Sequence, residues 1–250
     1  MIDTTLPNLY DRLTELDFNG KAGNFLQMKG FHQRSDGRWT RNYAQSMETP
    51  WVHQFRHLSH SIQPNCELWH QLFFEHTKWT PTECAKNCWK VVVVIPTLKN
   101  LFEVYELQKT MNHPCKCGLE HRPTDERRYG AYFYNNTKEE ALDCLDRVRK
   151  EFHSNIRKDL NIFMKCACSE YEVKNGPPED YIATPQQLQL ENLYKRYVVV
   201  NDIHFDQKPH QVAAIMLRWI HHAMHIGDMT YKRTTGGRSM APKMKTYERE

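Results

Sequence analysis

The sequence contains no run of about 18 apolar residues, the length that a membrane-spanning helix requires. Its longest apolar stretch, residues 91–95, has only the length of a strand. The first residues, Met1 to Thr4, also lack the basic and then apolar pattern of a secretory signal, so we expect a cytoplasmic protein with no membrane partner. No glycine-rich phosphate loop, nucleophile elbow or H-E-x-x-H motif occurs, so no specific motif indicates a reaction.

A large excess of charge of one sign is absent as well. The 250 residues include 34 Lys and Arg against 30 Asp and Glu, a formal net charge of +4, and the mean hydropathy is −0.76. The length allows one large domain or two small ones, each able to bury a core. The net charge does not identify a nucleic-acid partner, although it is compatible with a local basic surface.

Cysteine is the residue type that distinguishes the sequence. Six of the eight cysteines occur in close pairs, which are Cys84 and Cys88, Cys115 and Cys117, and Cys166 and Cys168. A disulfide framework is typical of short secreted chains, so we expect reduced thiols here. Metal ligands, buried small side chains and a reactive thiol remain as interpretations. The pairing favours metal ligation, although no pair has the C-x2-C spacing of a zinc ribbon.

The region between the first and last cysteine pairs predicts a βαββαβ unit. The β-branched residues 91–95 indicate a strand, and apolar residues at helical spacing indicate a helix from residue 98 to about 112. The other expected strands are at 115–119, 129–134 and 161–168, and the second helix follows Thr137. This order is the ferredoxin-like arrangement. We therefore predict an α+β protein with a central ferredoxin-like domain at residues 84–176.

The expected topology brings the three cysteine pairs to one rim of the sheet. With right-handed crossovers, the starts of the first two strands and the end of the fourth strand lie at the same end of the sheet. One tetrathiolate site is predicted at this rim. Its first candidates are Cys88, Cys115, Cys117 and Cys168, with His113 or His121 as an alternative ligand. Zn2+ and a [4Fe-4S] cluster suit such a site equally, so the spacing leaves both open.

Residues 1–83 form a Trp- and His-rich N-terminal region whose tryptophans are candidate anchors for a protein partner. His53, His57 and His60 share a face if their stretch is helical, but without a nearby carboxylate or cysteine they are more typical of core or solvated histidines. Between residues 34 and 43, arginines alternate with aromatic residues around a predicted turn. Such a mixture is typical of segments that contact phosphates and stack on bases, and it also occurs in exposed hairpins with no such function. The candidate nucleic-acid ligands there are Arg34, Arg38, Trp39, Arg41 and Tyr43.

Residues 177–250 begin as a proline-containing linker, continue as a small α/β segment and end as a basic tail. The tail has few apolar groups, so we expect it to be mobile. Its cations Lys232, Arg233 and Arg238 are candidates for contact with DNA or RNA. A solvated terminus has the same composition.

Residues 197–204 read Tyr-Val-Val-Val-Asn-Asp-Ile-His, a strand followed by Asp-x-His. This segment resembles the opening motif of calcineurin-like metallophosphoesterases, and Gly227-Asp228 is similar to the second metal motif of that family. The resemblance implies that Asp202, His204 and Asp228 ligate a pair of metal ions that activates water for phosphate-ester hydrolysis.

Three hypotheses follow. The favoured one is a metal-thiolate protein, with zinc or an iron–sulfur cluster, that associates with nucleic acid through its basic and aromatic flanks. The alternative is a metal-dependent enzyme, with cluster-based redox chemistry at the rim or phosphoester hydrolysis at Asp202, His204 and Asp228. The third is a protein–protein scaffold that uses the Trp-rich region.

Overall fold

The computed structural model describes the chain at residues 21–28, 30–42, 49–55, 80–122, 126–201, 207–241 and 247. The protein is mixed α+β, as expected. It divides into two compact units that interleave along the sequence. Unit 1 comprises Met1–Gln45, His60–Trp89 and Cys166–His204, and unit 2 comprises Ser46–Ser59, Lys90–Lys165 and Phe205–Glu250. Each unit therefore draws on segments that are far apart in the sequence.

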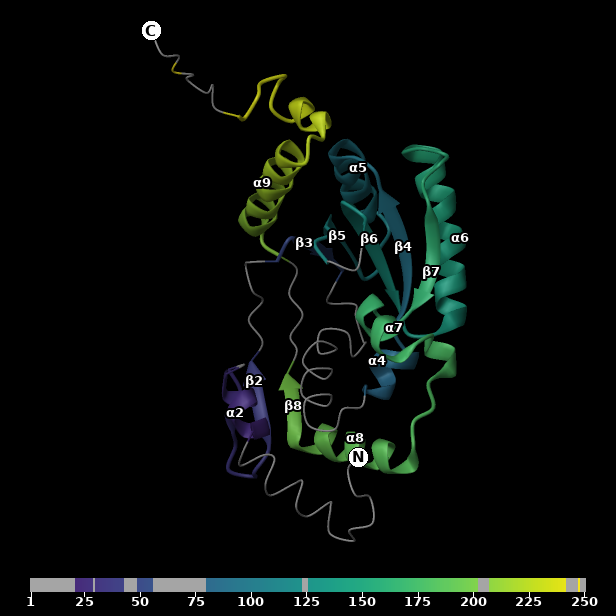
Figure 1. Cartoon of the computed structure of the whole chain (residues 1–250), viewed down its shortest axis with the longest axis vertical. Helices are drawn as coiled ribbons and strands as arrows, with labels where there is room; N and C mark the ends of the chain where they lie inside the picture. The colour runs from purple at the N-terminus through teal and green to yellow at the C-terminus, as the bar shows by residue number, and fades with distance from the viewer. Residues whose placement is uncertain are drawn as a thin grey trace. The chain divides into compact units, whose positions relative to one another are not determined.

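Unit 1 contains a small three-stranded sheet of order β1-β2-β8 (Figure 1). Strands β1 (His32–Gln33) and β2 (Trp39–Asn42) form an antiparallel hairpin, and β2 runs parallel to β8 (Val198–Asn201). The hairpin turns at Gly37, whose φ of +80° lies in the left-handed region that glycine tolerates. The helices described in this unit are α2 (Lys21–Met28), α4 (Thr82–Lys86), α7 (Ser169–Asn175), the 3-10 helix η3 (Pro178–Asp180) and α8 (Pro185–Tyr197).

Unit 2 is built on a five-stranded sheet of order β3-β5-β6-β4-β7 (Figure 1). Its strands are β3 (Trp51–Gln54), β4 (Trp89–Ile95), β5 (Cys115–Leu119), β6 (Tyr129–Asn135) and β7 (Ile162–Cys166). Strand β5 pairs antiparallel with both neighbours, so that Cys117 lies opposite Val52 on one side and Ala131 on the other. The helices described here are α5 (Leu98–Gln108), α6 (Lys138–Asn155), α9 (Pro209–His225) and the 3-10 helix η4 (Met229–Arg233).

The helices and strands expected between residues 89 and 168 are confirmed, with small changes at their ends. Thr97 and Thr137 cap α5 and α6, because each hydroxyl accepts a hydrogen bond from the backbone N–H three residues later. The last strand ends at Cys166, two residues early, because Ala167 has a φ of +59° and turns the chain. The seven-residue helix α7 that follows is not among the predicted elements.

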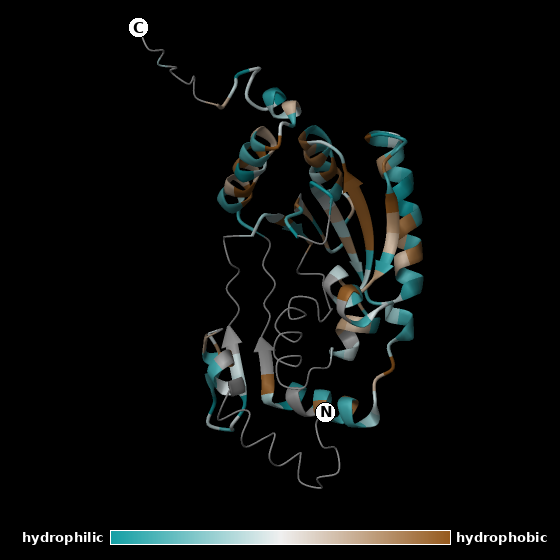
Figure 2. Cartoon of the chain, viewed as in Figure 1, coloured by the Kyte–Doolittle hydropathy of each residue, from teal (hydrophilic) through white to brown (hydrophobic). Residues whose placement is uncertain are grey.

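The core of unit 2 lies between the sheet and its helices. Alternate residues of β4, Val91, Val93 and Ile95, belong to it, and Figure 2 shows that this strand is almost uniformly hydrophobic. Phe152 of α6 and Trp219 of α9 are both fully buried in the same core. Complete burial of side chains of this size contributes about 1.5–3 kcal/mol each. Within the described ranges, no helix is long and apolar enough to cross a membrane.

Candidate functional site

Two of the three cysteine pairs lie in unit 1. Cys84 is on α4, Cys88 follows that helix, Cys166 ends β7 and Cys168 precedes α7. The backbone N–H of Ala167 donates to the carbonyl oxygen of Cys88 at 2.9 Å, which joins the two segments. The buried Cys166 thiol donates to the carbonyl oxygens of Ala85 and Lys86, at 3.5 and 3.4 Å. In this arrangement Cys166 is a protonated thiol that satisfies carbonyl groups near the end of α4.

The third pair lies on β5 in unit 2, where Cys115 and Cys117 belong to the core. Cys117 is 0% exposed, and burial raises the pKa of its thiol. Burial therefore disfavours the thiolate, the form that binds metals. No group of three or more His, Cys, Asp or Glu side chains is arranged to hold a metal ion in the part of the chain that the structure describes. The structure thus joins the pairs at 84/88 and 166/168, and it assigns the pair at 115/117 to a different unit.

The arginines of the β1–β2 hairpin share one carboxylate. Asp36 accepts a hydrogen bond from the Arg38 guanidinium at 2.7 Å and lies 3.6 Å from the Arg34 guanidinium. The hydrogen bond from Arg38 lowers the pKa of Asp36. Trp39, in contrast, is only 3% exposed, so its ring packs inside unit 1 and is not open to a stacking base. The exposed groups of the hairpin are therefore partly neutralised arginines.

Several candidates from the sequence fall outside the described residues. These are Tyr43, His57, His60, Asp202 and His204. Arg41 lies on β2 and His53 on β3. The backbone N–H of His53 donates to the side chain of Gln207 at 2.8 Å, so the edge strand β3 is tied to the segment that precedes α9.

Asp228, the last residue of the phosphoesterase-like pattern, is 7% exposed. Its Oδ2 accepts from the backbone N–H of Leu98 at 2.6 Å and from the Tyr129 hydroxyl at 3.0 Å. Its Oδ1 accepts from the N–H and the hydroxyl of Thr230, at 3.0 and 2.7 Å. Burial raises the pKa of Asp228, but these hydrogen bonds outweigh it and the pKa is lowered. A carboxylate has about four lone-pair sites, so the four donors occupy all of them.

Cys144 on α6 lies close to His113, which precedes β5. The Cys144 sulfur lies 3.7 Å from Nε2 of His113, and the same nitrogen lies 2.9 Å from the carbonyl oxygen of Tyr134. We assign the proton to Nε2, because the other nitrogen, Nδ1, accepts from Arg147 at 2.9 Å. A protonated Nε2 does not accept the thiol proton, and burial raises the pKa of Cys144. The pair is therefore not an activated nucleophile.

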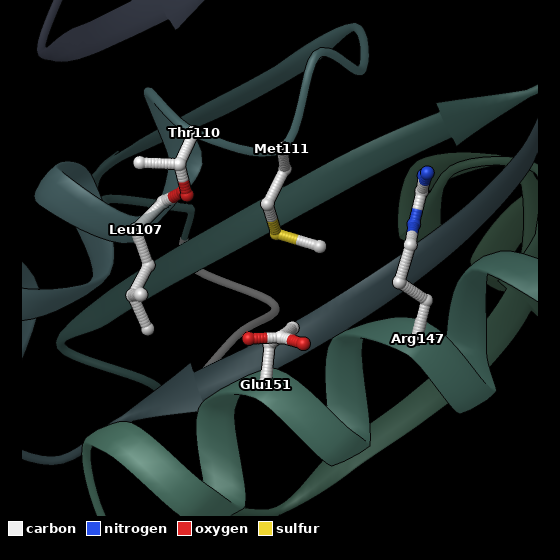
Figure 3. Close-up of a pocket in the computed structure, with 5 residues that line it drawn as sticks. All are labelled: Leu107, Thr110, Met111, Arg147 and Glu151. Carbon is white, nitrogen blue, oxygen red and sulfur yellow. The ribbon is translucent and has the colours of Figure 1, made fainter.

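Arg147 also borders an open pocket of about 320 Å³ between α6 and the end of α5 (Figure 3). Arg147 and Glu151 project from α6 toward the other lining residues, which are Leu107, Thr110 and Met111. One cation and one anion stand one helical turn apart beside apolar and hydroxyl groups. This lining carries no net charge and does not specify a charged ligand.

The sheet face opposite the core carries a polar cluster around Tyr132, which the sequence analysis did not identify. The Tyr132 hydroxyl donates to Glu120 at 2.6 Å, and Arg122 donates to the same carboxylate and to the Tyr132 oxygen at 2.7 Å each. The Lys116 ammonium lies 4.4 Å from the ring centroid of Trp51 and 5.4 Å from that of Tyr132. Glu120 is 6% exposed, so this cluster holds the sheet face together and leaves its carboxylate closed to ligands.

Five basic residues of unit 2 lie on α9, on and after η4, and directly before β6. They are Arg128, Arg218, Lys232, Arg233 and Arg238, and we call this set the C-terminal basic surface. Lys232 is half-buried and the other four side chains are exposed. None of the five forms an ion pair with a carboxylate of the described ranges. Arg128 and Arg218 were not among the candidates predicted from the sequence. Their positive charge is the only feature of the sequence that could have indicated them, since Arg128 directly precedes a strand and Arg218 lies within the amphipathic helix α9.

Residues 207–241, which contain α9 and η4, are more basic than the chain as a whole. Residues 207–241 contain five Lys and Arg and a single acidic residue, so their net charge equals the +4 of the whole sequence. That acidic residue is the buried Asp228, whose carboxylate is held by four donors. Residues 207–241 therefore contain exposed cations but no exposed carboxylate.

Comparison with protein-family models, with curated proteins and with solved structures found no significant match. The functional interpretation therefore depends on the geometry and charge of the residues themselves.

Proposed function

We propose that this protein binds nucleic acid through the C-terminal basic surface. The observation that carries this proposal is the charge of residues 207–241, where the only carboxylate is buried and four of the five cations are exposed. A polyanion gains most from such a surface, because each phosphate that contacts Lys or Arg releases a condensed counterion. Arginine predominates, and its planar fork matches phosphate oxygens in bidentate contacts.

The test is the binding of a fluorescein-labelled 20-bp DNA duplex, followed by anisotropy at several salt concentrations. If all five cations contact phosphates, the slope of log K against log salt is about −4.5, and Kd weakens about 500-fold between 50 and 200 mM salt. In the triple variant Lys232→Ala, Arg233→Ala, Arg238→Ala we expect a slope that is shallower by about 2.7.

A matched control removes the same amount of charge elsewhere. Lys109, Arg157 and Lys195 are paired with Glu106, Asp159 and Glu191 in the structure, so their replacement by Ala is expected to leave the slope unchanged. Equal loss of binding in the two triple variants would show that net charge alone matters and would contradict the proposal. Binding to vesicles of anionic lipid, without binding to the duplex at 50 mM salt, would also contradict it.

A second proposed function is a metal-thiolate site in unit 1, formed by Cys84, Cys88, Cys166 and Cys168. The hydrogen bond from Ala167 to Cys88 and the contact of Cys166 with the end of α4 support it, because they bring the two segments together. Metal binding requires the Cys166 thiol to lose its proton and leave the carbonyl oxygens of α4. Zinc bound there would be a structural ion that stabilises the folded state, and an iron–sulfur cluster would add redox chemistry.

The metal content of protein purified anaerobically without chelator tests this second proposal. We expect one zinc ion per chain, or brown protein with absorbance near 400 nm if a cluster is bound. The metal should be lost in the Cys88→Ser variant and retained in Cys117→Ser, since Cys117 is in the core of the other unit. Protein with no bound metal and a full complement of free thiols would refute it.

We also propose that the predicted domain at residues 84–176 contains the ferredoxin-like arrangement, formed by β4 to β7 with α5 and α6. The order of β5, β6, β4 and β7 in the sheet supports this topology, as does the βαββαβ order of the elements along the chain. In this arrangement β3 is an additional edge strand beside β5. The cations of the C-terminal basic surface belong to elements that follow this region, except Arg128.

A further inference from the structure

Two imidazole side chains from different elements meet beside the C-terminal basic surface. The ring centroids of His121, which follows β5, and His222 of α9 lie 5.0 Å apart in an edge-to-face arrangement. The His222 ring also lies 6.0 Å from the ring of Tyr129 at the start of β6. His121 is exposed and His222 is half-buried, so both imidazoles are within reach of a ligand at the surface.

Arg128 adds a guanidinium to this pair. It directly precedes Tyr129, it is exposed, and its positive charge acts on His222. Burial lowers the pKa of His222, and the neighbouring His121, His225 and Arg128 lower it further. His222 is therefore held neutral at pH 7, because both burial and the positive charge around it disfavour the imidazolium. An anion bound between His121, Arg128 and His222 would offset the positive charge of these neighbours and raise the pKa of His222.

Two carboxylates near this group, those of Asp228 and Glu120, are already engaged. Asp228 of the α9–η4 connection accepts four hydrogen bonds, including the one from Tyr129. Glu120, next to His121, is held by Arg122 and Tyr132. Other charged or titratable groups on the described parts of the neighbouring elements include Glu126 and Arg127 before β6, His210, Arg218, His221 and His225 on α9, Tyr231, Lys232 and Arg233 on η4, and Lys99, Glu103, Tyr105 and Glu106 on α5.

We propose that His121, Arg128 and His222 form a phosphate subsite that takes up a proton at His222 when it is filled. This inference rests on the proposed binding of nucleic acid and assigns one backbone phosphate to a defined set of side chains. The proton comes from the solvent and adds to a ring nitrogen of neutral His222, which then donates to a phosphate oxygen. Arg128 supplies the permanent charge, and Tyr129 stays bonded to Asp228.

Linkage then makes affinity depend on pH. If a bound phosphate raises the pKa of His222 by one unit, the protonated protein binds tenfold more tightly than the neutral one. We expect Kd for the 20-bp duplex to tighten from pH 8 to pH 5.5 in the unmodified protein. In His222→Gln this tightening should be smaller, by a factor that reaches about ten at pH values below the pKa of His222 in the free protein. At pH 8 the two proteins should bind alike, because His222 is neutral in one and absent from the other.

A second histidine on the same helix provides the matched control. His210 is exposed and lies 12 residues before His222, which is about 18 Å along a helix. His210→Gln should keep the full pH dependence. The ring resonances of His222, titrated by NMR in 50 mM sodium phosphate and in 50 mM sodium chloride, give a reading that does not involve nucleic acid. The midpoint should be higher in phosphate by about half a pH unit or more, since a bound anion favours the charged form.

The outcomes separate this inference from the proposed function. Duplex binding whose pH dependence survives in His222→Gln would overturn the subsite and leave nucleic-acid binding intact. Absence of duplex binding at both pH values in 50 mM salt would overturn the proposed function itself. An identical His222 midpoint in phosphate and chloride would also overturn the subsite, whatever the duplex experiment shows.

Discussion

Replacement of Asp228 by Ala tests whether this residue is a structural carboxylate, as its contacts indicate, or a metal ligand. The change removes the acceptor for the N–H of Leu98, for the Tyr129 hydroxyl and for both donors of Thr230. Asp228 is the N-cap of η4, and the loss of such a cap costs about 1 kcal/mol. The buried hydroxyl of Tyr129, left without its acceptor, costs about 1–3 kcal/mol. We therefore expect the free energy of unfolding of unit 2 to fall by about 3 kcal/mol.

The expected loss is large enough to measure by thermal unfolding. At roughly 2–4 °C per kcal/mol for a protein of this size, Asp228→Ala should lower Tm by about 6–12 °C. Asp159→Ala is the control, because Asp159 is an exposed carboxylate paired with Arg157 at the surface. That variant should leave Tm unchanged within error. A Tm shift below about 3 °C in Asp228→Ala would refute the structural role and favour the metal-ligand hypothesis.

The pH dependence of stability gives an independent check on Asp228. Its pKa is lower in the folded protein than the value of about 3.9 in an unfolded chain. The ionised carboxylate therefore stabilises the folded state fully above that value, and this contribution is lost as pH falls through the lower folded pKa. The difference in Tm between the unmodified protein and Asp228→Ala should be constant above about pH 5 and shrink in acid.

Three further variants test the sheet face, the edge strand and the cysteine contact. Tyr132→Phe removes a donor to the buried carboxylate of Glu120, so the free energy of unfolding should fall by about 1–2 kcal/mol in urea titrations. Gly118→Ala should destabilise more than Tyr132→Phe in the same assay, because the new Cβ would lie 2.3 Å from the carbonyl oxygen of Pro50. Cys166→Ser should retain the donor to α4 and melt above Cys166→Ala, whereas equal melting temperatures would contradict the thiol contact.

The sequence predicted the elements of the central region well. The reason is local, because β-branched residues and helical spacing identify β4 and α5, and the hydroxyls of Thr97 and Thr137 mark the starts of two helices. The exact end of β7 was less predictable, since the sequence Cys-Ala-Cys does not reveal that Ala167 adopts a positive φ. Such a conformation depends on the tertiary contacts that hold it.

The candidate sites were harder to predict than the elements. Spacing indicated three equivalent cysteine pairs, but alternation along β5 directs Cys115 and Cys117 into the core of unit 2. The resemblance of Gly227-Asp228 to a phosphoesterase metal motif suggested a metal ligand at Asp228, and only the folded chain brings Leu98, Tyr129 and Thr230 to it. Residues that are 130 positions apart have no common pattern in the sequence, so their contact was not predictable.

By itself, the sequence determined the secondary structure of the central region, the scarcity of long apolar segments and the basic character of the C-terminal residues, because these depend on local composition and periodicity. The tertiary structure decided which charges stay exposed. It buries the one acidic residue of the segment 207–241, leaves the three arginines of that segment exposed and places His121 against His222. Burial and hydrogen bonding, which arise only when distant segments pack together, remove the one acidic side chain of this basic segment from the surface.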